Sequence, residues 1–202
     1  MVDMHYPLIL SALCDKIRLG GDYPPKEEFM NNETLDIIKT RRSIRSYKSD
    51  AIPAELLDAV LEAGKFAPSG MGRQSPVLIA VESRKNRDRI AELNAAALGA
   101  DTDPYYGAPV VILVLADGGI RTCVEDGSCA LENMMLAAHS LGLGTVWVHR
   151  EKEIFESEAG KELLREWGLP LTLCGVGSIA IGYPADGPSE RLPRKDGYVV
   201  RV

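Results

Sequence analysis

A cationic stretch at residues 39–48 is the part of this chain best suited to binding chemistry. It carries Arg41, Arg42 and Arg45, and no acidic residue occurs from position 37 to position 49. Guanidinium groups bind phosphate through paired hydrogen bonds, and the hydroxyl of Ser43 can bond a further phosphate oxygen. Two interpretations of this stretch alone stay open. It is either a phosphate site or a solvated helix end whose cations offset the helix dipole.

The overall composition disfavours several broad classes of protein. The chain has 202 residues, 46% of them hydrophobic, which is enough for one substantial core. A net charge of −6 and an isoelectric point near 5.2 argue against a general nucleic-acid binder. No apolar run approaches the roughly 20 residues that span a bilayer. The apolar run at 7–13 lacks a preceding basic segment, so we expect no signal peptide and a cytoplasmic protein.

The four cysteines do not form a metal-binding pattern. No Cys-x-x-Cys occurs, and no histidine stands at ligand spacing from a pair of cysteines. We therefore expect no metal. We expect reduced thiols that are mostly small core residues, at Cys14, Cys123, Cys129 and Cys174.

The first 29 residues differ from the rest of the chain. Paired glycines at 20–21 and paired prolines at 24–25 interrupt any periodicity there. We expect an extension over 1–29 and a folded domain over 30–202. One hypothesis is that the natural start is Met30 and that the preceding stretch is not native.

Hydrophobic periodicity predicts a mixture of helices and strands over residues 30–202. The expected helices are one that begins after Asn32, one from Pro53 to near Phe66, and three over 84–98, 125–141 and 152–167. The expected strands cover 77–81, 109–116, 145–149, 171–181 and 198–202. The run at 109–116 is apolar throughout, which is typical of a strand buried on both faces. The pattern predicts a layered α/β or α+β domain.

Several common catalytic and cofactor motifs are absent. No Gly-x-Gly-x-x-Gly follows a strand, and there is no Walker loop, His-Glu-x-x-His or Gly-x-Ser-x-Gly. Gly142 is most simply the C-cap of the preceding helix, although a glycine there could also let a flat ligand approach the backbone. His149 is either a pocket residue or an exposed residue at a strand end.

Taken together, four features resemble the FMN-dependent nitroreductase family. Arg41-Arg42-Ser43-x-Arg45 is similar to that family's phosphate-binding signature, and Ala67-Pro68-Ser69-Gly70 with Gln74 follows about 25 residues later. The helix at 133–144 ends in Leu-Gly-Leu-Gly, and a basic group, Arg194-Lys195, precedes the C-terminal segment. The resemblance covers roughly residues 32–202.

The resemblance implies an α+β domain with a three-layer α/β/α arrangement around a central mixed β-sheet. It also implies an intertwined homodimer with FMN at the subunit interface. The residues it assigns to the phosphate are Arg41, Arg42, Ser43, Arg45, Arg194 and Lys195. Those it assigns to the flavin ring are Pro68, Ser69, Gly70, Gln74, Val146, Trp147, Val148 and His149. A backbone N–H near Val148 or His149 is expected to donate to flavin N5. No side chain is assigned as a covalent nucleophile.

The chain departs from the family pattern in two places. Gly72 replaces an asparagine whose amide usually bonds the pyrimidine edge of the flavin, and Gln74 or Arg73 is left to substitute for it. The usual Lys-x-Arg near the C-terminus reads Leu192-Pro193-Arg194, so the cation that accompanies Arg194 is Arg191 or Lys195.

The activity implied by the resemblance is ping-pong hydride transfer from NADH or NADPH, through FMN, to a small aromatic acceptor. Nitroaromatics, quinones and free flavin are the expected acceptors. The alternatives are reductive dehalogenation or dehydrogenation on the same fold, a flavin-storage module, and an anion-binding regulatory protein without flavin. A lid is expected at residues 94–108, where Tyr105 and Tyr106 either stack on the substrate or pack internally.

Two features favour a dimer on physical grounds. Met134, Met135 and Leu136 are consecutive, so their helix is apolar on more than one face, and a second copy of the helix could cover the remainder. The expected strand at 198–202 has no hairpin partner nearby and could join the sheet of the other subunit.

Overall fold

The computed structural model describes residues 32–202, and the extension, Met30 and Cys14 lie outside the described residues. The chain divides into two compact units, residues 1–39 and 40–202. Of the first unit, the structure describes residues 32–39, most of them in helix α3 (Glu33–Thr40), whose first turn is capped by the side chain of Asn32. All other elements belong to the second unit.

The second unit is built on a four-stranded sheet with the order β1-β2-β4-β3. The strands are β1 (Pro76–Val81), β2 (Val110–Asp117), β3 (Gly144–Val148) and β4 (Leu173–Gly182). All three pairings are antiparallel, so the named strands do not form the mixed sheet that we expected. The parallel component is one isolated bridge between Ser43 and Thr145, beside the edge strand β3.

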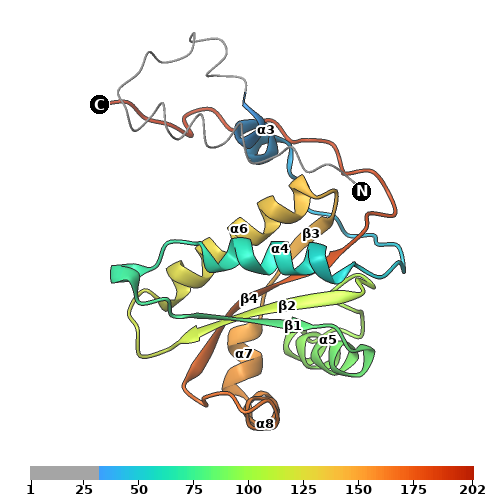
Figure 1. Cartoon of the computed structure of the whole chain (residues 1–202), viewed down its shortest axis with the longest axis vertical. Coiled ribbons are helices and arrows are strands. Elements are labelled where there is room, and N and C mark those ends of the chain that lie inside the picture. Colours follow the sequence, from blue (N-terminus) through green and yellow to red (C-terminus); the bar gives the residue numbers. More distant parts are fainter. Residues whose placement is uncertain (1–31) are drawn as a thin grey trace, which may run out of the picture. The chain divides into compact units, whose positions relative to one another are not determined.

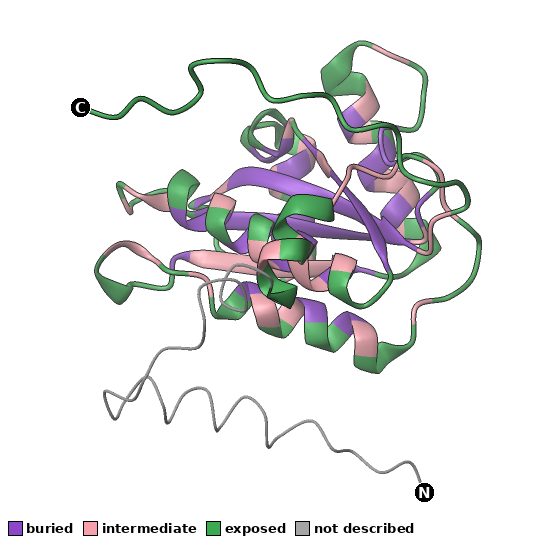
Figure 2. Cartoon of the chain, turned by 90° about the horizontal axis from the view of Figure 1, so that it is seen from above, coloured by how far each residue is buried: buried purple, intermediate pink, exposed green. Residues whose placement is uncertain are grey.

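Helices cover both faces of this sheet, which confirms the three-layer α+β fold (Figure 1). Helices α4 (Ala54–Lys65) and α6 (Cys123–Ser140) pack on one face. Helices α5 (Arg84–Leu98), α7 (Glu151–Glu156) and α8 (Glu158–Glu166) pack on the other. Alternate residues of β2 enter the two cores, with Leu113 on the α5 side and Ile112 on the α6 side. The central strands are buried along nearly their whole length, as Figure 2 shows, with Asp117 of β2 exposed and Cys174 of β4 half-buried.

Local signals located most helix boundaries. The expected helix at 84–98 matches α5, whose N-cap is Ser83 and whose C-cap is Gly99 with a left-handed φ of 71°. Gly142 also has a positive φ, 77°, but the C-cap of α6 is Leu141, so the glycine follows the cap instead of forming it. The single helix expected at 152–167 is wrong, because the chain breaks at Ser157. The Ser157 side chain accepts from Gly160 N and caps α8, which therefore begins anew.

Two features that favoured a dimer in the sequence look different in the folded chain. Met134 and Met135 are both buried within the single chain by α4 and the sheet, so they need no second copy of the helix. Residues 198–202 form no strand in this chain, which contradicts the expected C-terminal strand. Tyr198, Val199 and Val200 are instead largely exposed at the end of the tail (Figure 2).

The described cysteines are free thiols but not core residues. Cys129 is exposed, while Cys123 and Cys174 are half-buried with their sulfur atoms 3.6 Å apart. Within residues 32–202, no cluster of three or more His, Cys, Asp or Glu side chains is placed to bind a metal ion. None of the helices in that range is long and apolar enough to cross a membrane.

Candidate functional site

The cationic signature is fixed against the outer edge of β3. Ser43 pairs with Thr145 in the parallel bridge, and Ile44 N donates to Thr145 O at 2.9 Å. Gly144 makes this contact possible, because a Cβ there would lie 2.9 Å from the side chain of Ile44. The glycine after α6 therefore admits a neighbouring segment of the same chain.

Tyr47 anchors the end of the signature. Its hydroxyl donates to Ile44 O at 2.7 Å and lies 3.2 Å from Ala180 O, and burial raises the pKa of this phenol. Lys48 N donates to Tyr183 O. The signature is thereby held rigidly to the ends of β3 and β4, as a binding loop must be.

The three arginines of the signature have different surroundings. Arg41 lies 3.9 Å from Glu132 of α6, a long ion pair that leaves the guanidinium available for a stronger anion. Arg42 turns back and donates to Thr40 O and Arg41 O at 2.9 and 2.7 Å. Arg45 is exposed and lies over the ring of Tyr106. Of the three, Arg41 is the best placed to meet a phosphate.

His139 of α6 lies beside the cations of the signature. Its Nε2 is 2.9 Å from the hydroxyl of Thr40. Burial, and then the charges of Arg41 and Arg42, lower the pKa of this imidazole. The neutral form of His139 is thus favoured, and the two arginines beside it are cations that an anion would neutralise.

A pocket of about 290 Å³ opens beside the signature. Its walls come from two chain segments, Ser43, Ile44, Arg45 and Ser46 on one side and Asp186, Gly187, Pro188 and Ser189 on the other. Ser43 and Arg45 offer donors to an anion there, whereas Asp186 is a negative charge on the opposite wall. Two of the expected phosphate residues therefore share one cavity.

The Pro68-Ser69-Gly70 loop is held by a buried carboxylate that the sequence motifs did not identify. Asp126 of α6 accepts Gly70 N at 2.8 Å and the Ser75 hydroxyl at 2.7 Å. These two bonds lower the pKa of Asp126, the one from Gly70 N contributing most. Ser69 Oγ accepts Gln74 N at 2.9 Å, which closes the loop on itself. Ser69 and Gln74 also line a pocket of about 350 Å³ between α4 and β1.

Gly70 is required at its position by a close contact. A Cβ on Gly70 would lie 2.3 Å from Thr122 Oγ1, which itself donates to Asp126. We expect Gly70→Ala to lower the free energy of unfolding by about 1–3 kcal/mol, because overpacking forces the loop off Asp126. Denaturant unfolding measures this loss. Gly187→Ala is the control, since nothing lies within 4 Å of its added Cβ.

The residues of β3 offer mainly backbone N–H and C=O groups to a ligand. Val146 and Val148 are buried in the core on the α5 side. The half-buried Trp147 packs toward α6, where Gly177 leaves room for its indole. His149 is exposed, with its ring 6.0 Å from that of Trp147. Any flavin contact at this strand end would therefore come from His149 and the backbone that follows it.

One chain does not bring all the expected site residues together. The signature meets α6 near His139, whereas the Pro68–Gly70 loop meets it at Asp126. These positions are 13 residues apart, or about 20 Å along the helix at roughly 1.5 Å per residue. Figure 1 shows the segments that precede and follow α4 at its opposite ends. Signature and loop are thus separate half-sites.

Arg194 and Lys195 lie in the exposed tail. Lys195 Nζ is 5.5 Å from the centre of the Tyr198 ring, a contact within the tail itself. Among the described contacts, none joins either cation to Arg41 or Ser43. Their assignment to the phosphate stays a prediction.

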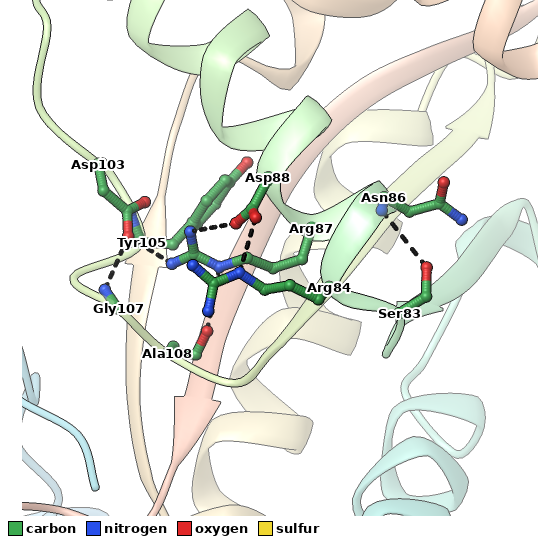
Figure 3. A network of polar contacts seen from close by, with 9 residues as sticks. All are labelled: Ser83, Arg84, Asn86, Arg87, Asp88, Asp103, Tyr105, Gly107 and Ala108. Atoms are coloured by element: carbon green, nitrogen blue, oxygen red, sulfur yellow. Dashed lines mark hydrogen bonds and ion pairs between the residues drawn. The ribbon is translucent and has the colours of Figure 1, made fainter. Parts of the chain in front are cut away.

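The segment expected to be a lid is largely immobilised. Residues 94–98 belong to α5, and Tyr105 is fully buried. Figure 3 shows the cause: the buried Arg87 pairs with Asp103 and donates to Ala108 O. Asp103 also accepts the backbone N–H groups of Tyr105 and Gly107. Tyr105 therefore packs internally, while Tyr106 remains exposed near Arg45.

Comparisons with known proteins point to one family. Residues 38–183 match the model of the nitroreductase family. A protein of Methanothermobacter thermautotrophicus, provisionally named an NADH dehydrogenase/NAD(P)H nitroreductase, is 35% identical over 165 residues, covering 79% of this chain and 81% of the relative. An FMN reductase [NAD(P)H] of Bacillus subtilis is 29% identical, covering 81% of this chain and 72% of the relative.

A solved structure gives the same result in three dimensions. The nitroreductase of Bacteroides fragilis, crystallised with bound FMN, superimposes with a TM-score of 0.79 at 31% sequence identity. The match covers 85% of this chain and all of that one. With a family model that spans most of the second unit and relatives of this identity, the chain belongs to the nitroreductase family.

Proposed function

We propose that this protein is an FMN-dependent NAD(P)H oxidoreductase. The observation that carries the proposal is the outer edge of β3, which has the Ser43 signature at one end and His149 at the other. Thr145 and His149 are four residues apart, about 13 Å at roughly 3.3 Å per strand residue. FMN as a whole, with its ring at one end and its phosphate at the other, is long enough to bridge such a span. The relatives named as NAD(P)H nitroreductase and FMN reductase support the same cofactor and donor.

The residues present fit FMN at its phosphate end. Arg41 and Ser43 supply a charged and a neutral donor, and the charges of Arg41 and Arg42, which add to burial in lowering the pKa of His139, favour a dianion. When bound, FMN would supply the hydride chemistry, accepting from NADH or NADPH and giving to an acceptor. The chain's own contribution is to hold the phosphate, present backbone N–H groups at the end of β3, and exclude water from the ring.

The two half-sites support a shared site in a homodimer. A flavin that contacts both the signature and the Pro68–Gly70 loop would take them from different copies of the chain, given their separation on α6. Phe66 and Met71 flank that loop with exposed apolar side chains, which a partner surface would cover. The exposed tail at 198–202 would add a strand to the sheet of the partner. Arg194 and Lys195, which precede that segment, would then lie on the partner subunit as well.

The proposal is tested first by cofactor and then by turnover. Purified protein should be yellow and release FMN on denaturation, and colourless protein without flavin would favour an anion-binding regulator. Steady oxidation of NADH or NADPH should then require a nitroaromatic, quinone or free flavin. Parallel double-reciprocal plots would support the ping-pong order. Bound flavin without turnover would favour a storage module, and halide release from a halogenated aromatic would favour dehalogenation.

A shortened chain tests the proposed domain boundary. We expect a protein that starts at Met30 to keep its flavin and activity, because the signature, the loop and every described strand follow that residue. Flavin content and NAD(P)H oxidation, measured beside the full chain, check this. An insoluble or colourless product would show that residues 1–29 are structural.

A further inference from the structure

A buried polar cluster lies directly behind the end of β3. It is formed by one side chain from each of α5, the segment before β2, α7 and β4, and its members are Asn94, Tyr105, Glu151 and Ser178. All four are fully buried. Burying so many polar groups is costly unless they are bonded to one another, so a cluster of this kind needs a reason beyond packing.

Asn94 connects this cluster to the backbone at the end of β3. Its Nδ2 donates to His149 O at 2.8 Å, and its Oδ1 accepts Arg150 Nε at 2.8 Å. One amide thus holds both the carbonyl of the His149–Arg150 peptide and the side chain that follows it. The contacts fix the orientation of that peptide unit from inside the core.

The backbone held in this way is strained. Arg150 has φ 90° and ψ 6°, a left-handed conformation that non-glycine residues adopt at a cost. Such a conformation persists only where surrounding contacts impose it, and the two bonds to Asn94 are among those contacts, together with the bond from Ile154 N to Arg150 O at the start of α7. Strain of this kind concentrates at functional sites.

The direction of the Arg150 N–H follows from peptide geometry. No peptide bond in the described residues is cis, and in a trans peptide the C=O and N–H point in opposite directions. Because His149 O points inward to Asn94, the N–H of Arg150 points away from the buried cluster. Within residues 32–202, this N–H has no hydrogen-bond acceptor.

We propose that Asn94 is a positioning residue for the bound flavin, aiming the N–H of Arg150 out of the core at the end of β3, and that the proton on Glu151 supports this arrangement. The inference rests on the proposed flavin site. It assigns a role to a side chain that itself touches no substrate and that lies 55 positions before His149 in the sequence.

Glu151 is the titratable member of the cluster. Its Oε1 lies within bonding distance of the Ser178 and Tyr105 hydroxyls and of Asn94 Nδ2, whereas its Oε2 is buried with no partner. Burial raises the pKa of this carboxyl to about 7, and the hydroxyl of Ser178 and the charge of Arg150 oppose the rise.

The remaining charged and titratable groups around Glu151 are few. Tyr105 comes from the segment before β2, and burial raises the pKa of its phenol, so it stays neutral. Arg87 of α5 lies over the other side of that ring, 5.9 Å from its centroid. β4 contributes only the neutral Ser178. Glu151 is therefore the group in this cluster that changes charge near neutral pH.

The first test is the midpoint potential of the bound flavin in Asn94→Ala. We expect FMN binding through the phosphate to persist, while the preference for reduced over oxidised flavin falls about tenfold, a shift of about −30 mV for a two-electron couple. Tyr105→Phe is the matched control, because it removes the Tyr105 hydroxyl and its contact with Asn94 but leaves the Asn94 bonds to His149 O and Arg150 Nε intact. It should lower stability without moving the potential.

If Asn94→Ala fails to fold, Asn94→Asp keeps the test of Asn94 decisive, because it keeps the size of the side chain but removes the amide donor to His149 O. Glu151→Gln tests the part assigned to Glu151, because it mimics the protonated acid in size and shape. In the parent protein, folding raises the pKa of Glu151. Its contribution to the free energy of unfolding is therefore fully present at pH values below the usual carboxyl pKa, and it is lost as the pH rises through about 7. The plot of the flavin midpoint potential against pH should change slope at the same pH. Glu151→Gln should abolish both the change of slope and the loss of stability.

The possible results distinguish a failure of the proposed function from a failure of the positioning role of Asn94. A parent protein that binds no FMN would overturn the proposed function. A parent that binds FMN, with an unchanged potential in a folded Asn94→Ala variant, would overturn only the positioning role. An equal shift in Tyr105→Phe would also overturn it, since the effect would then be a general consequence of loosening the cluster. If the midpoint potential of Glu151→Gln still changes slope with pH near 7, the role assigned to Glu151 is wrong.

Discussion

Replacing Arg41 with alanine is expected to weaken FMN binding at least about tenfold. Hydrogen bonds to charged groups contribute roughly 1.5–3 kcal/mol, and each 1.4 kcal/mol is about a factor of ten in affinity. Arg41 now has only a 3.9 Å ion pair with Glu132, so little internal bonding competes with a phosphate. Fluorescence titration of the apoprotein with FMN measures the change. Ser43→Ala should act in the same direction by losing a neutral bond.

Lys48→Ala is the matched control for this prediction. Lys48 is an exposed cation in the same stretch, and its backbone N–H, which survives the substitution, makes the contact to Tyr183 O. The two alanine variants therefore change the net charge equally. If Arg41→Ala binds FMN as tightly as Lys48→Ala and the parent, the phosphate does not lie at the signature.

Deleting residues 198–202 is expected to convert a stable dimer into a monomer that loses its flavin. Tyr198, Val199 and Val200 are exposed in the single chain, and covering one such side chain contributes roughly 1.5–3 kcal/mol. Loss of several would weaken association by orders of magnitude. We expect the full chain to form a dimer of about twice 22.0 kDa that persists at micromolar concentration. Light scattering and the flavin-to-protein ratio check both forms.

A full-length Arg194→Ala, Lys195→Ala variant separates charge from association. It keeps the apolar end of the tail, so we expect it to remain dimeric while it binds FMN more weakly. A truncated protein that is still a yellow dimer would contradict the role of the tail. A full chain that is monomeric, yellow and active would overturn the interface and the shared site together.

The elements were predictable where a short stretch of sequence decides them. The run at 110–117 is apolar at nearly every position, and this pattern alone predicts a central strand. Ser83 and Gly99 terminate α5 by bonds within a few residues. The break at Ser157 was missed because the apolar pattern continues across it, and a cap and an uninterrupted helix differ there only in backbone conformation.

The candidate site was predictable only in part, for a related reason. The order of signature, loop and glycine-ended helix indicated the family, which the comparisons confirmed. The groups that position these motifs carry no local signal. Asp126 meets Gly70 across 56 residues, and Asn94 meets His149 across 55. An aspartate or asparagine on an amphipathic helix looks the same in sequence whether it is solvated or buried.

Periodicity, caps and short motifs are local properties, and they were enough to predict most of the helices and strands, the family and the residues offered to a phosphate. Three features became clear only in the folded chain: Tyr105 packs inward, Glu151 is buried with a raised pKa, and the signature and the loop lie at opposite ends of α6. Burial and charge depend on which distant segments meet, and that is a property of the folded chain.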